Sequence, residues 1–230
     1  MSVDEQPLLI DVDAGIGPVP AVLARPAGAR ATVVVAHGAG AGKDHPFLSG
    51  FARAIADLGL ASLRFDFPYL AAGRRFPDRP PVAIATWRAL ADAARAHAGE
   101  GEPVWASGKS FGGRMASMAV ADGMDVAGLV FLGYPLHPPG RPEKARDEHF
   151  AALTGVPMLF LQGRNDPFAI PNEQLDELVR RVGPSAVLDW VDEANHSFEV
   201  KGAKRPAREI GGSLAPCVAA FVDAHRPSGG

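Results

Sequence analysis

The sequence predicts an α/β protein, with a mostly parallel sheet of about eight strands that carries helices on both faces. Short apolar runs recur along the chain, and segments with helical spacing alternate with them. This alternation is typical of βαβ units, whose strands are buried on both faces and read as continuous hydrophobic runs. The 230 residues, 47% of them hydrophobic, are enough for a large core, so we expect a single domain over residues 1–230.

Each predicted strand is a short run rich in apolar and β-branched residues. A turn containing Gly and Pro separates the first two runs, which indicates an opening antiparallel hairpin. The expected strands cover residues 8–13, 19–25, 31–37, 61–67, 104–107, 126–132, 157–162 and 186–191.

Three further segments place apolar side chains at positions i, i+3, i+4 and i+7, the spacing of one helix face. They are Trp87, Leu90, Ala91 and Ala94, then Leu175, Leu178, Val179 and Val182, and finally Leu214, Cys217, Val218 and Phe221. Because Cys217 lies on the apolar face of the last segment, we expect its thiol to be buried.

The composition argues against several classes of protein. A net charge of −3 and a pI near 6.2 leave no basic stripe for nucleic acid or an anionic membrane. A single cysteine excludes a disulfide framework, and no His, Asp or Glu cluster has metal-ligand spacing. No apolar run approaches the roughly 20 residues of a membrane span, and the first residues lack the features of a secretory signal. We therefore expect a cytoplasmic protein that uses no metal or cofactor and acts on a small molecule.

The central motif has the form G-x-S-x-G at residues 108–112, with Ser110 in the middle. It follows the predicted strand 104–107 and precedes a helical stretch that begins near Arg114. In this pattern the serine occupies a sharp strand-to-helix turn that exposes its hydroxyl. Side chains two residues before and after the serine would collide, so both positions are glycine. The motif indicates a nucleophilic serine, and the alternative interpretation of the motif alone is a plain glycine-rich turn.

The same residues also suggest a competing function. Gly108-Lys109-Ser110 matches the end of the phosphate-binding pattern G-x-x-x-x-G-K-[ST], which requires glycine at position 103. Pro103 stands there. Nucleotide-binding folds usually carry this loop after their first strand, whereas several strands precede residue 108. A nucleotide site is therefore the weaker hypothesis.

A second glycine-rich turn begins with His37-Gly38-Ala39 and continues to residue 42. Small residues let the backbone approach a reacting group with its N–H donors exposed. In hydrolases whose serine occupies such a strand-to-helix turn, a glycine-rich turn at this place supplies one oxyanion donor, and the residue after the nucleophile supplies the other. The predicted donors are the amides of Ala39 and Phe111. A dinucleotide-binding fingerprint is not formed, because it requires glycine at position 43, which is lysine.

A serine nucleophile of this type is followed along the chain by an acid and then by a histidine. His196 is the best-placed base, because it comes directly after the last predicted strand. Asp166 is the best-placed acid, because it follows the strand 157–162 at the carboxyl edge of the sheet. Asp189 and Asp192 are the alternatives for the acid, but one lies inside a strand and the other is only four residues from His196. The remaining downstream histidines are expected to be structural or on the surface: His137, His149 and His225.

Three segments together resemble the α/β-hydrolase superfamily over essentially the whole chain. They read HGAGAG at 37–42, RFDFPY at 64–69 and GKSFGGR at 108–114. More narrowly, they resemble a small branch related to the dienelactone hydrolases and to the hydrolase-like domain of a chromatin-associated acetyltransferase-complex subunit. The resemblance implies the α/β-hydrolase fold, an eight-stranded sheet with an antiparallel second strand, and a catalytic triad of Ser110, Asp166 and His196.

The sequence departs from these relatives in two respects. Dienelactone hydrolases use a cysteine nucleophile, whereas serine stands at position 110, so their particular reaction is not implied. Lipases and many esterases carry a large cap after the sixth strand, whereas only residues 134–155 are available here. We therefore expect little or no cap.

Three further residues are candidate substrate contacts. His45 and Tyr69 lie on loops expected at the carboxyl edge of the sheet, and Lys109 adjoins the nucleophile. The Lys109 cation is suited to attract an acidic substrate, and the alternative is a structural pair with an acid such as Asp66.

The function that these features predict is hydrolysis of a small ester or thioester through an acyl-enzyme. Ser110 would attack, His196 would take its proton, and Asp166 would orient the histidine. The alternative hypothesis is a hydrolase-like fold that serves as a non-catalytic binding or scaffold module.

Overall fold

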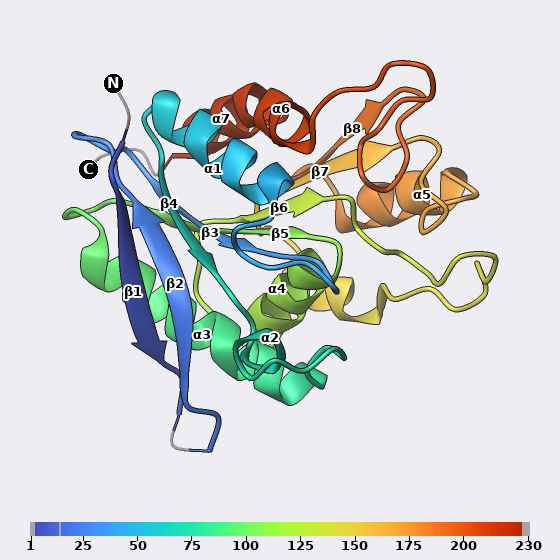
Figure 1. The fold of residues 1–230 in the computed structure, drawn as a ribbon. Helices are drawn as coiled ribbons and strands as arrows, with labels where there is room; N and C mark the ends of the chain where they lie inside the picture. Colours follow the sequence, from blue (N-terminus) through green and yellow to red (C-terminus); the bar gives the residue numbers. More distant parts are fainter. Residues whose placement is uncertain (1–2, 14, 227–230) are drawn as a thin grey trace.

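The computed structural model describes residues 3–13 and 15–226, and the eight strands of this part form one sheet (Figure 1). The sheet order is β1-β2-β4-β3-β5-β6-β7-β8. The strands are β1 (Glu5–Asp11), β2 (Pro18–Ala24), β3 (Thr32–Ala36), β4 (Ala61–Phe65), β5 (Val104–Lys109), β6 (Leu129–Leu132), β7 (Met158–Gly163) and β8 (Ala186–Val191).

The strand directions agree with the mostly parallel sheet that the sequence predicts. Strand β2 runs antiparallel to both of its neighbours, β1 and β4, and the pairs from β4 across to β8 are parallel. The predicted opening hairpin is therefore confirmed. Because parallel strands end at one edge of the sheet, the loops after β3, β5, β7 and β8 gather there.

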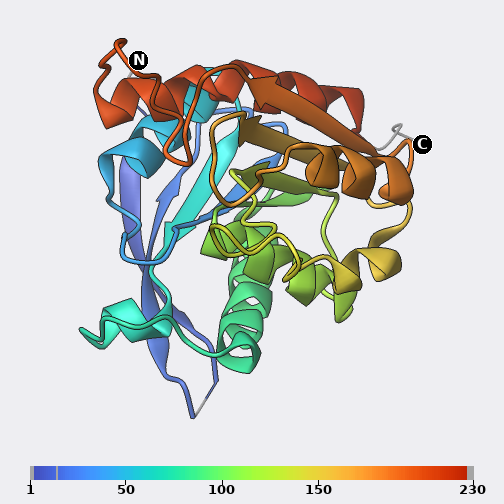
Figure 2. The ribbon, with the colours of Figure 1, turned by 90° about the vertical axis from the view of Figure 1, so that its right-hand side faces the viewer.

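Helices cover both faces of the sheet, as Figure 1 and the perpendicular view in Figure 2 show. One face carries α1, α6 and α7, and the other carries α3, α4 and α5. The helices are α1 (Pro46–Asp57), α2 (Pro68–Ala71), α3 (Pro80–His97), α4 (Phe111–Ala121), α5 (Glu173–Val182), α6 (Ala207–Ser213) and α7 (Ala215–Ala224), with a 3-10 helix η1 (Glu148–Leu153).

The central strands are buried on both faces because their side chains alternate between two hydrophobic cores. In β3, Val34 and Ala36 belong to the core under α3 and α4, whereas Val33 and Val35 belong to the core under α1 and α7. All four side chains are inaccessible to solvent. Full burial of one such valine stabilises the fold by about 1.5–3 kcal/mol. This two-sided burial explains why the run 31–37 is continuously apolar.

Helices α1 and α6 approach each other through glycine. A Cβ atom on Gly50 would lie 2.1 Å from the carbonyl oxygen of Arg208, and a Cβ on Gly211 would lie 2.0 Å from that of Phe47. Neither position tolerates a side chain, so the two backbones are in direct contact. This contact holds the N-terminal turns of both helices beside the end of the sheet.

The structure differs from the sequence-based predictions in a few details. The predicted strand 126–132 is shorter, because β6 begins at Leu129, and α4 begins at Phe111 rather than near Arg114. The thiol of Cys217 is only partly buried, so the prediction of a buried thiol is wrong. It lies at the rim of α7 and donates to Asp189 Oδ2 at 3.3 Å, and burial together with this carboxylate raises its pKa to about 11.

The segment 134–155 forms no cap over the carboxyl edge of the sheet. Its η1 turn packs against α4, where Phe150 and Leu153 are buried in the core. Within residues 3–13 and 15–226, no helix combines the length and the apolar character required for a membrane crossing.

Candidate active site

Ser110 lies at the sharp turn between β5 and α4, with φ 50° and ψ −113°. This is a strained conformation for a residue other than glycine, and it persists only where the surroundings enforce it. A Cβ on Gly108 would lie 2.2 Å from the Gly113 nitrogen, and one on Gly112 would lie 2.6 Å from the His37 carbonyl oxygen. The glycines at 108 and 112 are therefore required by close backbone packing, as the motif predicts.

The structure brings Ser110, His196 and Asp166 into hydrogen-bonding contact. The distance between Ser110 Oγ and His196 Nε2 is 2.8 Å, and that between His196 Nδ1 and Asp166 Oδ2 is 2.6 Å. A carboxylate only accepts hydrogen bonds, so the imidazole carries its proton on Nδ1. The lone pair on Nε2 then faces the serine hydroxyl. This geometry leaves Nε2 free to accept the serine proton.

Asp166 is fully buried directly after β7 and accepts three hydrogen bonds. Besides His196, the donors are Gln162 Nε2 at 2.6 Å and the Phe168 amide at 2.9 Å. The other end of the Gln162 amide accepts from the Tyr134 amide at 2.7 Å. Sequence reasoning missed Gln162, whose one signal is that it is a polar residue in an otherwise apolar strand. The two rival acids point elsewhere, since Asp189 meets Cys217 and Asp192 pairs with Arg164.

His196 lies in a loop of unusual shape after β8. Glu193 and Phe198, on either side of it, have φ values of 58° and 61°. The Asn195 side-chain oxygen accepts from the amides of Ser197 and Glu199, at 2.8 and 3.0 Å. These local bonds close the loop into a compact turn that carries the imidazole back over Ser110.

The glycine-rich turn after β3 is supported by its own buried histidine. His37 Nδ1 donates to the Gly38 carbonyl at 2.8 Å, and Nε2 accepts from the Phe67 amide at 3.0 Å. Burial lowers the pKa of this imidazole, which agrees with a neutral ring that donates once and accepts once. The turn is thereby tied to the loop after β4.

The two amides predicted as oxyanion donors are free to bind a ligand. Within the described residues, the N–H groups of Ala39 and Phe111 make no hydrogen bond to protein. Phe111 is the first residue of α4, so its amide also lies at the positive end of the helix dipole. The neighbouring Gly40 amide instead donates to the Tyr69 hydroxyl at 3.4 Å.

A cavity of about 430 Å³ opens beside Ser110 and His196. One wall is apolar and comes from α1 and α6: Phe47, Leu48, Ala207 and Ile210. The remaining lining includes charged and polar side chains, among them His45, Lys109 and Glu199. Two of the three candidate substrate contacts, His45 and Lys109, therefore line the cavity. Tyr69 does not, because it is fully buried behind the glycine-rich turn.

Lys109 has a different partner from the one considered above. Its Nζ donates to the main-chain carbonyl of His196 at 2.5 Å, whereas Asp66 accepts from the amide of Lys43 and pairs with its ammonium. The predicted pair between Lys109 and Asp66 is wrong. Burial lowers the pKa of Lys109 to about 8, and the charge of Asp166 offsets part of that effect.

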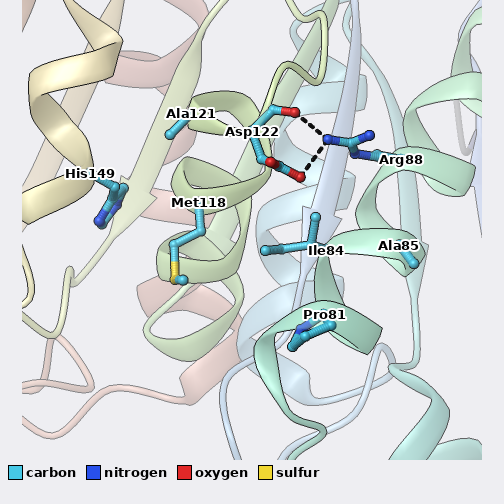
Figure 3. Close-up of a pocket in the computed structure, with 8 residues that line it drawn as sticks. All are labelled: Pro81, Ile84, Ala85, Arg88, Met118, Ala121, Asp122 and His149. Carbon is cyan, nitrogen blue, oxygen red and sulfur yellow. Dashed lines mark hydrogen bonds and ion pairs between the residues drawn. The ribbon is translucent and has the colours of Figure 1, made fainter.

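A second, more open cavity of about 550 Å³ lies between α3 and α4 and contains none of the predicted site residues (Figure 3). His149 forms one side of it, and the ion pair between Arg88 and Asp122 closes the other. His149 Nε2 lies 2.7 Å from Ser117 Oγ, but the serine also contacts the Arg114 carbonyl at 2.9 Å. Ser117 therefore donates to the backbone and accepts from the histidine, which leaves it unactivated.

Within residues 3–13 and 15–226, no group of three or more His, Cys, Asp or Glu side chains is arranged to hold a metal ion.

An eight-stranded, mostly parallel sheet with a strained serine between its central strand and a helix defines the class of α/β hydrolases. Residues 29–221 match the family described as "Alpha/beta hydrolase domain", and the chain belongs to this family.

Solved structures with the same fold include several hydrolases. A dienelactone hydrolase from Anabaena variabilis is 20% identical with a TM-score of 0.74, over 99% of this chain and 100% of that one. A serine hydrolase without lid from Xanthomonas campestris is 20% identical with a TM-score of 0.73, over 100% and 99%. The esterase domain of a Rhodothermus marinus protein is 16% identical with a TM-score of 0.72, over 97% and 100%. At these identities the likeness establishes the α/β-hydrolase fold.

Proposed function

We propose that the chain is a single-domain serine hydrolase that cleaves a small ester or thioester through an acyl-enzyme. The observation that carries the proposal is the continuous chain of hydrogen bonds from Ser110 Oγ through the His196 imidazole to Asp166. The strained turn at Ser110 and the two free amides beside it supply the remaining parts of such a site.

In the first half of the reaction, Ser110 Oγ attacks the carbonyl carbon of the substrate while its proton moves to His196 Nε2. The negative charge that develops on the carbonyl oxygen is held by the amides of Ala39 and Phe111. One such donor contributes about 3–4 kcal/mol to transition-state stabilisation in comparable enzymes. The tetrahedral intermediate collapses, the bond to the leaving group breaks, and His196 returns the proton to the departing oxygen or sulfur.

In the second half, water replaces the leaving group. His196 accepts a proton from the water as its oxygen attacks the acyl carbon, and then gives that proton to Ser110 as the acid product departs. Asp166 remains a carboxylate throughout and stabilises the imidazolium that forms in each half. Its three donors hold it in the orientation that this role requires.

The cavity supports a short, apolar acyl group as the preferred substrate part. Its volume of about 430 Å³ has to hold the whole reacting portion of the substrate, and α1 and α6 form its apolar side. No cap extends this wall outward. The acyl group would therefore contact Phe47, Leu48 and Ile210, and a long chain would project into water without gaining burial.

A fluorophosphonate probe tests the proposal, because it labels a serine only where a base activates it. We expect the wild-type protein to be labelled, and Ser110→Ala to abolish both labelling and the hydrolysis of p-nitrophenyl acetate. Ser117→Ala is a matched control, since Ser117 also contacts a histidine but donates its proton to the backbone. An unlabelled wild-type protein would contradict the proposal and favour the non-catalytic binding module.

A further inference from the structure

We propose that Lys109 is a positioning residue, which keeps the imidazole of His196 over Ser110 by binding the main chain of His196. The inference rests on the proposed function, and it concerns a side chain that takes no part in the proton transfers described above.

The ammonium of Lys109 connects two segments that are far apart in the sequence. Lys109 is the last residue of β5 and directly precedes Ser110, and its Nζ reaches the His196 carbonyl oxygen, 87 residues along the chain, at 2.5 Å. The Phe198 ring lies on another side of the ammonium, with 5.6 Å between Nζ and the ring centroid. One side chain thus joins the turn that carries the nucleophile to the loop that carries the base.

The neighbouring strand leaves room for this contact. A Cβ on Gly133, just after β6, would lie 3.2 Å from Lys109 Nζ and 3.6 Å from His196 Nδ1. A side chain at position 133 would therefore crowd the lysine ammonium and lie in van der Waals contact with the imidazole. The absence of a side chain at Gly133 thus leaves space for the ammonium beside the imidazole.

The His196 loop needs such a connection because its backbone is strained on both sides. Glu193 and Phe198 adopt left-handed conformations that residues other than glycine disfavour, and such conformations persist only where contacts with the surroundings hold them. Asp166 and the Phe168 ring contact the imidazole itself. Within the described residues, the hydrogen bond from Lys109 is the one that the His196 carbonyl accepts.

The alternative role, attraction of an anionic substrate, fits the surroundings less well. The ammonium already has a main-chain partner, and Glu199 lines the same cavity. An anion bound there would meet a carboxylate as well as the lysine. The geometry therefore favours a contact within the protein.

A double-mutant cycle between Lys109→Met and His196→Ala tests the proposal, with the rate of fluorophosphonate labelling and kcat and KM for p-nitrophenyl acetate as readouts. A displaced base costs about 10- to 100-fold, so we expect K109M to lower kcat and the labelling rate by about that factor, with KM little changed. The variant H196A keeps its main-chain carbonyl but has no imidazole to position. Labelling is lost in that background, so the readout there is the residual hydrolysis of p-nitrophenyl acetate, which K109M is expected to change less than about threefold.

Two further variants separate positioning from general destabilisation. Lys109→Arg keeps a cationic N–H donor and is expected to recover most of the lost kcat, and Lys109→Gln enters the same cycle if K109M does not fold. Lys144→Met removes an exposed lysine from the loop before η1 and serves as the matched control, with unchanged kinetics expected.

Each result bears on one hypothesis. An equal loss from K109M in both backgrounds, or no loss in the wild-type background, overturns the positioning role. A loss confined to an anionic ester such as p-nitrophenyl succinate, with the neutral acetate unaffected, assigns Lys109 to substrate recognition and also overturns it. A wild-type protein that is neither labelled nor active refutes the proposed function, and the role of Lys109 with it.

Discussion

Asp166→Asn separates the orienting role of the carboxylate from its bulk, because asparagine has nearly the same shape. In the native protein, Asp166 Oδ2 accepts from both His196 Nδ1 and Gln162 Nε2, each at 2.6 Å, while Oδ1 accepts from the Phe168 amide. Asparagine has one acceptor oxygen, which can take the place of either Oδ1 or Oδ2 but not of both. If it stays with Phe168, the new NH₂ group faces two donors.

The contact with Gln162 cannot be restored by turning its amide round, because Gln162 Oε1 already accepts from the Tyr134 amide. With the asparagine oxygen on the Phe168 amide, the imidazole can adapt only by moving its proton to Nε2 and accepting from the asparagine NH₂ group at Nδ1. In that tautomer Nε2 no longer accepts the Ser110 proton. We expect kcat to fall by about 10⁴-fold, equivalent to about 5.4 kcal/mol of transition-state stabilisation. The donor left buried against Gln162 costs a further 1–3 kcal/mol or so in unfolding free energy.

Initial rates with p-nitrophenyl acetate measure the first effect, and urea unfolding measures the second. Asp192→Asn is the matched control: this acid is four residues before His196, but it is exposed and pairs with Arg164. Its kinetics should stay within about twofold of wild type, because surface pairs contribute little. A D166N protein that folds and keeps more than about a tenth of wild-type kcat/KM would refute the assigned role.

Three other expectations concern the turn, the cavity and acid stability. Gly108→Ala forces a Cβ to 2.2 Å from the Gly113 nitrogen and should lower the unfolding free energy, measured in urea, by about 3 kcal/mol or more. Gly212→Ala is the control, because its new Cβ would come no closer than 3.6 Å to another atom, and it should not destabilise the fold. Across p-nitrophenyl esters the wild type should prefer short acyl chains, and Ile210→Ala should move this preference to longer chains. In the variant, each further methylene that becomes buried should raise kcat/KM by about fourfold. An unchanged preference would argue against this wall as the acyl site. Burial lowers the pKa of His149 from 6.5 to about 4, so as the pH drops the unfolded chain takes up this proton before the folded protein does, and the unfolding free energy falls between pH 6.5 and 4. Between pH 7.5 and 4.5 the unfolding free energy should fall less in His149→Gln than in the wild type. An equal fall in both proteins would contradict this cause.

The strands, their burial on both faces and the helices could be predicted from the sequence because they depend on local patterns. Two-sided burial requires continuous apolar runs, and helical packing requires the 3.6-residue period, so both leave readable signals. The turn at Ser110 could also be predicted from the sequence, because only glycine at 108 and 112 fits against the neighbouring backbone. The ends of some elements differ from the prediction, as at the start of β6 and of α4, because tertiary hydrogen bonding decides where an element begins.

For the site, the order of strands and motifs along the chain was enough to predict which residues follow parallel strands and reach the same edge: Ser110 after β5, Asp166 after β7 and His196 after β8. Which atoms meet at that edge depends on the tertiary structure. It paired Lys109 with the His196 carbonyl instead of Asp66, placed Gln162 against Asp166, and buried Tyr69 behind the glycine-rich turn. These contacts join segments from different strands and loops, so they depend on side-chain direction and strand register, which no local pattern in the chain encodes.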